Sequence, residues 1–260
     1  MTRRARFVLF LVAAAAVALL FVAAFVRLPP FGGDFHPYGD RAVRAAFAHR
    51  TANAVAAVNF DQRALDTLGE ETILFSAVLG AVVLLRQIAG ERRRPPRRAR
   101  VSGAIRRLGV AMLPVALLTG LYVVAHGQIT PGGGFQGGVV VATALHLLYV
   151  AADYGALERV RPLSLYEIGD ATGEAAYVVT GVATVLAGSA FLANVLPWGT
   201  FGTLTSAGTV VVLNAAVGME VACGVVVLLA TFLDQAVEIE EPSHAPASGG
   251  TPDGSGGDAG

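Results

Sequence analysis

The chain has 260 residues, of which 54% are hydrophobic and only 15% are charged, well below the roughly 25% charged residues of ordinary soluble domains. Its 19 cationic and 19 acidic side chains cancel, so no overall basic field favours nucleic acid. A single cysteine, Cys223, excludes an internal disulfide and a multi-cysteine zinc site. This composition indicates a membrane protein and argues against a soluble enzyme.

Six segments are predicted to cross a membrane as α-helices. Three are uninterrupted apolar runs, and each matches the ~30 Å of bilayer hydrocarbon at ~1.5 Å rise per residue. The other three are less regular: one begins with two glutamates, one is short, and one contains a glutamate near its middle. The predicted spans are residues 7–26, 68–89, 108–125, 137–152, 175–196 and 208–233.

The first apolar run, residues 7–26, follows three arginines, which is the pattern of a signal peptide or of a membrane anchor. A signal-peptide core usually has ~7–15 residues, and this run is longer. No clean small-x-small cleavage site follows it within residues 25–30. We therefore expect a retained anchor.

Arginine is the only cationic residue type in the chain, and its placement predicts the orientation. If the six helices alternate, 14 arginines lie on one side, nine of them within residues 86–107, and five lie on the other. Because cytoplasmic loops carry the excess of positive charge, both termini are expected in the cytoplasm. The basic run at residues 91–100 is interpreted as a topology signal that contacts anionic lipid rather than nucleic acid.

The same pattern divides the chain into four parts. Residues 1–90 form a two-helix part, residues 91–103 an Arg- and Pro-rich cytoplasmic linker, and residues 104–236 a four-helix part. Residues 237–260 are too polar to pack and are expected to be a disordered cytoplasmic tail. Residues 41–58 have helix-like Ala-rich spacing and are expected at the membrane interface or against a partner. The predicted fold class is an all-α integral membrane protein with six transmembrane helices.

The most distinctive local sequence, PGGGFQGG at residues 131–138, lies between the third and fourth predicted spans. Its glycines and proline interrupt a helix, and non-helical backbone in a membrane requires surrounding protein or a water-filled cavity. A phosphate cradle is disfavoured, because neither a Gly-Lys-Ser/Thr motif nor a preceding strand is present. We interpret the segment as an interface loop that packs on other helices. Its residues are Pro131, Gly132, Gly133, Gly134, Phe135, Gly137 and Gly138.

Several motifs occur together in the second half of the chain. They are PGGGFQGGVVVATALHLLYVAAD from residue 131, DATGE from residue 170, NVLP from residue 194, SAGT from residue 206 and LNAAVGMEV from residue 213. In this order they resemble the B subunit of multisubunit Na+/H+ antiporters of the Mrp (Mnh) type, over residues 104–236. Residues 59–85 are similar to the last helices of the A subunit of these antiporters and to a small membrane subunit of membrane-bound hydrogenases.

The resemblance implies a non-enzymatic membrane subunit of a monovalent cation/proton antiporter. The implied partners are the other subunits, Na+ or K+, H+ and membrane lipids, without a cofactor, metal or nucleic acid. The implied location is the prokaryotic cell membrane, as a multi-pass protein. Because the chain contains no lysine, it does not itself supply the Lys–Glu proton channel of the antiporter-like subunits. The alternative is a membrane-arm subunit of a hydrogenase-like or respiratory redox complex, where the same modules recur.

Ionisable and polar residues inside membrane segments are costly, so each is a functional candidate. Glu220 lies near the middle of the last span, and the small residues Ala216 and Gly224 one turn away would let another helix approach. Asn214 is roughly 120° away around the same helix, so the two are not expected to share a ligand. The ion-pathway candidates are Glu70, Glu220, His146 and Asn214.

Glu70 is the principal candidate, because it follows the glycine of the family-like Gly-Glu pair at residues 69–70. Glu71 lies about 100° around the helix, so the two cannot both face the same groove, and one of them is expected to point to headgroups or water. A competing interpretation makes both glutamates first-turn charges that stabilise the helix dipole, and the same holds for Asp170 and Glu174. For His146 and Glu220, both a structural hydrogen bond and a role in ion movement remain open.

Overall fold

The computed structural model describes residues 3–28, 32–34, 36–85, 102–151 and 162–233, and every regular element within these ranges is helical. The linker residues 91–101, Arg159, Arg161 and the tail at 237–260 lie outside them. Four of the described helices are long and apolar enough to cross a membrane, which makes this a multi-pass membrane protein. They are α1 (Arg3–Val26), α4 (Ala64–Leu84), α5 (Gly103–Ala125) and α9 (Thr209–Leu233).

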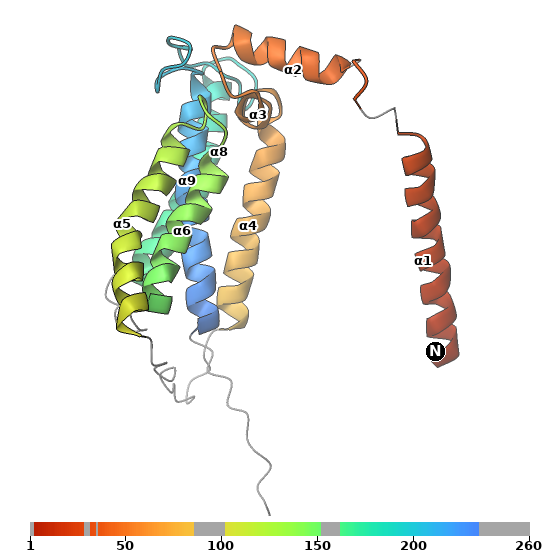
Figure 1. The fold of residues 1–260 in the computed structure, drawn as a ribbon. Helices are drawn as coiled ribbons and strands as arrows, with labels where there is room; N and C mark the ends of the chain where they lie inside the picture. The colour runs from red at the N-terminus through yellow and green to blue at the C-terminus, as the bar shows by residue number, and fades with distance from the viewer. Residues whose placement is uncertain (1–2, 29–31, 35, 86–101, 152–161, 234–260) are drawn as a thin grey trace, which may run out of the picture.

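Two further helices occupy the remaining predicted spans. α6 (Gly134–Ala151) is apolar but shorter, and α8 (Leu163–Leu186) is long but contains three acidic residues. Together with α4, α5 and α9 they form one bundle (Figure 1). α9 is the central helix, because α4, α5, α6 and α8 all pack against it.

The core of the bundle is built around α9. Val217, Val221 and Leu213 of α9 pack with Tyr177 of α8 and with Phe60, which precedes α4. In lipid, apolar burial does not itself drive helices together, so close packing and polar contacts hold such a bundle.

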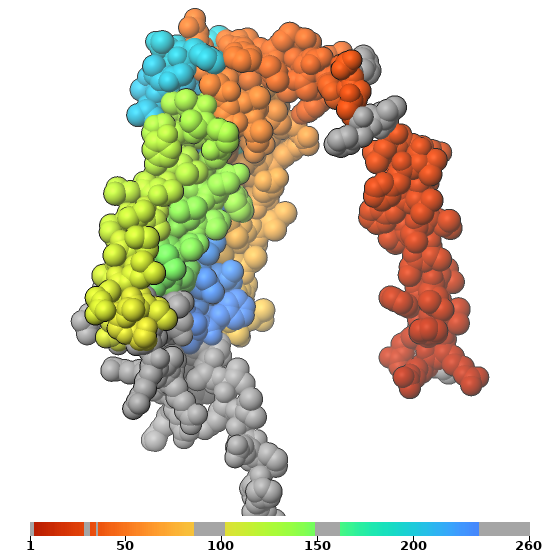
Figure 2. Space-filling model, viewed as in Figure 1, coloured from red at the N-terminus to blue at the C-terminus, as the bar shows by residue number. Residues whose placement is uncertain are grey.

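α1 has a different environment, since all its side chains are exposed and it stands apart from the bundle (Figure 1). Figure 2 shows the open space between α1 and the rest of the molecule. The amphipathic helix α2 (Pro37–Ala48) crosses the end of this space and buries Ala42 and Ala46. The helix-like segment predicted at residues 41–58 is therefore present only in part, because α2 ends at Ala48 and residues 49–53 are not helical. α2 extends from the bundle toward α1 (Figure 1).

Several connections gather at this same end of the bundle, which we call the loop end (Figure 1). They are α3 (Ala54–Ala57), the π-helical turn η1 (Val58–Gln62), the Gly-rich segment before α6, and residues 187–208. Asn53 caps the N-terminus of α3, and its side-chain oxygen accepts hydrogen bonds from the backbone N–H groups of Val55 and Ala56.

The fifth predicted span, residues 175–196, differs from the helix that forms. α8 begins at Leu163, directly after Pro162, and ends at Leu186. Gly188 adopts a positive φ of 80° and closes the helix, while the N–H of Ser189 bonds the carbonyl of Thr184 at 3.0 Å. The apolar residues that follow therefore lie in an irregular connection.

This shift changes the position of two predicted first-turn charges. Asp170 and Glu174 lie in the interior of α8, beyond its first turn, and Asp170 is buried. The interaction of a charge with the helix dipole falls off within the first turn. Dipole stabilisation therefore does not explain these two carboxyls.

Candidate functional site

The Gly-rich loop packs directly on α9. The backbone N–H of Gly134 donates a hydrogen bond of 2.9 Å to Oδ1 of the buried Asn214 side chain. A Cβ at Gly134 would lie 2.4 Å from the carbonyl oxygen of Asn214, so only glycine permits this approach. The predicted packing of the loop on other helices is thus present within the chain, whereas its contact with other subunits stays a prediction.

Two amide side chains connect the segments of the loop end. Asn53 donates from Nδ2 to the carbonyls of Gly127 at 2.7 Å and Thr130 at 2.9 Å. Gln128, which is fully buried, donates from Nε2 to the carbonyl of Leu204 at 2.8 Å. The segment before α6 is thereby tied both to the α3 region and to the α8–α9 connection.

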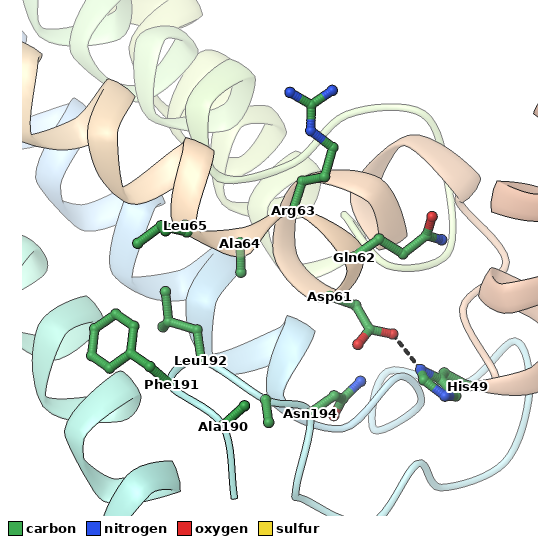
Figure 3. Close-up of a pocket in the computed structure, with 11 residues that line it drawn as sticks. His49, Asp61, Gln62, Arg63, Ala64, Leu65, Ala190, Phe191, Leu192 and Asn194 are labelled. Atoms are coloured by element: carbon green, nitrogen blue, oxygen red, sulfur yellow. Dashed lines mark hydrogen bonds and ion pairs between the residues drawn. The ribbon is translucent and has the colours of Figure 1, made fainter. Parts of the chain in front are cut away.

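A cavity of about 480 Å³ opens at the loop end between residues 61–65 and 190–194 (Figure 3). Nδ1 of His49 lies 2.5 Å from a carboxylate oxygen of Asp61, and the His49 ring stacks on Trp198 with centroids 4.4 Å apart. Arg63 points away from this pair in Figure 3 and pairs with Asp66 instead. The His49–Asp61 pair was not predicted, because the chain gives no spacing signal for residues on different elements.

The most unusual chemistry lies deeper, between α4, α8 and α9. Glu71 of α4 and Glu220 of α9 are both fully buried, and none of their carboxyl oxygens has a hydrogen-bond donor among the described residues. The two carboxyls face each other, with Asp170 and Glu174 of α8 nearby. Oε1 of Glu174 accepts a hydrogen bond of 2.8 Å from the Thr72 hydroxyl, which links α8 to α4.

Small residues bring α8 and α9 together at this point. A Cβ at Gly173 would lie 2.6 Å from Cβ of Glu220 and 2.8 Å from the carbonyl oxygen of Ala216. One turn further along α9, a Cβ at Gly224 would lie 2.7 Å from Oδ1 of Asp170. The close helix approach predicted from the small residues around Glu220 is therefore observed.

The four predicted ion-pathway residues do not form one cluster. Glu220 lies in the acidic group, whereas Asn214 is engaged with the Gly-rich loop. His146 is half-buried on α6, which packs against α5 and α9. These placements agree with the expectation that Asn214 and Glu220 act separately.

Glu70 and Glu71 are placed differently from the expectation. Glu70 is exposed and Glu71 is buried, so the carboxyl that faces inward is that of Glu71 and not that of the principal candidate, Glu70. Both nevertheless line a second cavity of about 250 Å³, together with Thr67, Gln136 and Gly133. Stabilisation of the helix dipole would be the same for either glutamate. The packing of α4 on α9 distinguishes them, because it buries Glu71 and leaves Glu70 exposed.

Comparison with known proteins agrees with this architecture. Residues 104–227 match the family model of a domain related to the MnhB subunit of Na+/H+ antiporters. An uncharacterised protein of Methanocaldococcus jannaschii is 30% identical over 201 residues, covering 66% of this chain and 73% of that protein. The chain belongs to the MnhB-related family. The B subunit of a Na(+)/H(+) antiporter of Bacillus subtilis is 31% identical to the MnhB-related chain over 80 residues, which cover 31% of this chain and 55% of the Bacillus protein.

Two solved structures resemble the MnhB-related chain over most of its length. A chain of the membrane-bound sulfane sulfur reductase, an archaeal respiratory membrane complex, superposes with a TM-score of 0.70 and 28% identity, covering 88% of this chain and 98% of that one. A chain of the Mrp complex from Dietzia sp. DQ12-45-1b superposes with a TM-score of 0.67 and 24% identity. That match covers 93% of this chain and 27% of the Dietzia chain, and it shows a shared fold.

Proposed function

We propose that this chain is a membrane subunit of a multisubunit monovalent cation/proton antiporter in the prokaryotic cell membrane. The MnhB-related domain at residues 104–227 carries the proposal. The buried carboxyls that α4, α8 and α9 bring together support a role in ion movement, because uncompensated charge inside a membrane bundle is costly to retain. The proposed partners are the other antiporter subunits, Na+ or K+, H+ and membrane lipids.

The test is transport by the assembled complex. The chain, expressed with its neighbouring subunits, is reconstituted in vesicles, and Na+-dependent and K+-dependent proton movement is followed with a pH-sensitive dye. Cation-dependent proton movement that disappears when this chain is omitted is expected. A complex that retains full exchange without the chain would contradict the proposal.

The second candidate function is a membrane-arm subunit of a respiratory redox complex. It is favoured by one observation, the match to nearly the whole length of a sulfane sulfur reductase chain. Purification of the tagged chain from its native membranes separates the two candidates. Co-purification of antiporter-like subunits alone supports the antiporter, whereas iron–sulfur or nickel subunits support the redox complex.

The proposed topology has six transmembrane helices, with both termini in the cytoplasm and a division into parts at residues 1–90, 91–103, 104–236 and 237–260. It is supported by the six long helices and by the arginine asymmetry of 14 to five. Single cysteines introduced at residues 95, 158 and 245 in a Cys223→Ser background should all be labelled only from the cytoplasmic side. A cysteine at Thr200, in the exposed loop end, should be labelled only from the opposite side.

Within this function, Glu70, Glu220, His146 and Asn214 are the proposed ion-pathway residues, and the loop at residues 131–138 is a proposed interface with other subunits. For Glu70, its exposure on the wall of the second cavity supports contact with arriving ions. The test compares Glu70→Gln with Glu167→Gln, which changes another exposed glutamate, on α8. Loss of exchange confined to Glu70→Gln is expected, and equal effects would contradict the assignment.

A further inference from the structure

The carboxyls of Glu71 and Glu220 form a contact that belongs to neither helix alone. Glu71 lies on α4 and Glu220 on α9, both are 0% exposed, and they come close enough to share a hydrogen bond if one carries a proton. All four of their oxygens lack a donor among the described residues. Two ionised carboxylates within hydrogen-bonding reach would repel each other, and both would lack the hydration that stabilises a charge.

The surrounding groups do not neutralise the pair. Among the described residues, the other charged side chains that act on it are those of Glu70, Asp170 and Glu174, which are acidic and add repulsion. The nearby hydroxyl of Tyr177 donates to the carbonyl of Ala64, and that of Thr67 donates to the carbonyl of Asn59. These hydroxyl groups therefore donate their protons to backbone carbonyls and not to the two carboxyls.

A proton suits this environment better than a metal cation. A dehydrated Na+ needs several oxygen ligands, but the carbonyls of α4 and α9 around the pair are held in helical hydrogen bonds. A single proton needs only the two carboxyls, because the protonated one donates to the other. It removes one negative charge and supplies the missing donor at the same time.

The second cavity gives the pair access from the loop end. Its wall contains the exposed Glu70 and the buried Glu71, along with the polar side chains of Asn59, Thr67 and Gln136. A cavity with several polar groups is the kind that holds water. The cavity thus joins a surface carboxyl to one member of the buried pair.

On the other side of the pair, the acidic row continues along α8. Glu174 lies near Glu220, and Asp170 contacts Gly224, one helical turn beyond Glu220 on α9. Because α8 and α9 run in opposite directions, this places Asp170 further from the loop end than the pair. The pair therefore occupies a middle position in a row of carboxyls.

We propose that Glu71 and Glu220 share one proton and form a proton-binding site between the two-helix part and the MnhB-related domain. A proton arriving through the cavity forms an O–H bond on Glu71, and that bond breaks as the proton passes to Glu220. The hydrogen-bonding partner of each carboxyl is the other one. The proton-binding site stands on the geometry alone, whereas its use in ion exchange rests on the proposed function.

The test is infrared spectroscopy of the full chain in lipid at neutral pH, in H2O and D2O. The wild type is expected to show the C=O stretch of a protonated carboxyl. The Glu71→Gln/Glu220→Gln double variant should lose this contribution, and each single variant should shift it, because an amide replaces the carboxyl partner. Glu167→Gln, at an exposed glutamate of α8 that is not part of the acidic group, should leave it unchanged.

Glutamine is close in size to glutamate, and size-exclusion chromatography checks that each variant remains folded. A wild-type spectrum identical to that of the double variant would overturn the proton-binding site. A difference that appears only on adding Na+ would overturn it in favour of a cation site. In the reconstituted complex, either single variant should abolish Na+-dependent proton movement, while Glu167→Gln retains it.

Loss of the infrared contribution together with full transport in the variants would overturn the relay step and leave the subunit's function standing. Conversely, a wild-type complex without any exchange would contradict the proposed function, and the infrared result would still decide whether the pair binds a proton. The two proposals therefore fail separately.

Discussion

α1 and α9 have nearly the same length and are both apolar enough to span a bilayer. In α1 no residue is buried, whereas in α9 more than half of the residues are. Small residues do not explain the difference, since α1 contains the run Ala13–Ala16 without packing on anything. The polar residues Asn214 and Glu220 of α9 explain the difference in burial, because a buried polar group requires protein around it.

The largest effect is expected where the Gly-rich loop meets α9. In Gly134→Val, the new side chain would meet backbone atoms of Asn214 and Gly218, which cannot move aside like a side chain. We expect a loss above the ~1–3 kcal/mol typical of over-packing, and little folded protein. Ala14→Val on the exposed α1 is the matched control and should stay within ~0.5 kcal/mol of wild type. The monodisperse fraction in detergent and the thermal unfolding midpoint measure both.

A second test removes one polar contact of α9. Asn214→Leu deletes the acceptor of the Gly134 N–H and leaves that donor buried, at an expected cost of about 1–3 kcal/mol. Asn214→Asp retains an acceptor oxygen at the same position and should recover part of this stability. Thermal unfolding in lipid nanodiscs compares the two variants. Equal midpoints would show that the hydrogen bond does not hold the loop on α9.

A smaller effect is expected at the loop end. His49→Ala removes both the contact with Asp61 and the stacking on Trp198, with an expected loss of about 0.5–1.5 kcal/mol. Asp66→Ala disrupts the more exposed pair with Arg63, and exposed pairs contribute only ~0–1 kcal/mol. Chemical denaturation should therefore rank His49→Ala below Asp66→Ala in stability. The reverse order would mean that the His49 cluster does not hold the loops together.

The smallest effect is expected in α1. Leu19→Ala shortens an exposed side chain that contacts no part of the bundle, so the unfolding midpoint of the bundle should change by less than the equivalent of ~0.5 kcal/mol. Leu213→Ala, at a fully buried position of α9, is the counterpart and should cost ~2–5 kcal/mol. A destabilisation by Leu19→Ala as large as that by Leu213→Ala would break the comparison between the two helices.

Much of the fold could be predicted from hydropathy, because the length of an apolar run reports directly on membrane thickness. The bounds of α8 could not be predicted in this way, since its three acidic residues interrupt the apolar signal at one end while the signal continues past Gly188 at the other. Hydropathy assigns each residue to lipid or water. It has no category for a carboxyl that is surrounded by protein.

The candidate site was predicted in part. Glu220 and the small residues beside it stand out in sequence, and the structure places them at a close helix crossing. The orientation of Glu70 and Glu71 required the rotation of α4 about its axis, which adjacent residues of the same type do not reveal. The His49–Asp61 pair required tertiary contacts at the loop end, for which no local pattern exists.

The side chain of Asn53 caps the N-terminus of α3 and also donates hydrogen bonds to two carbonyls of the segment before α6. In addition, α4 packs against α8 and α9. These contacts do not depend on a peptide connection between α4 and α5. If one gene encoded the first 90 residues and a second gene the remainder, the two chains should therefore form the same contacts. Their association would cost only the additional entropy of bringing two chains together. Gene fusion and gene splitting in such proteins would then alter how subunits are counted without altering how they fit.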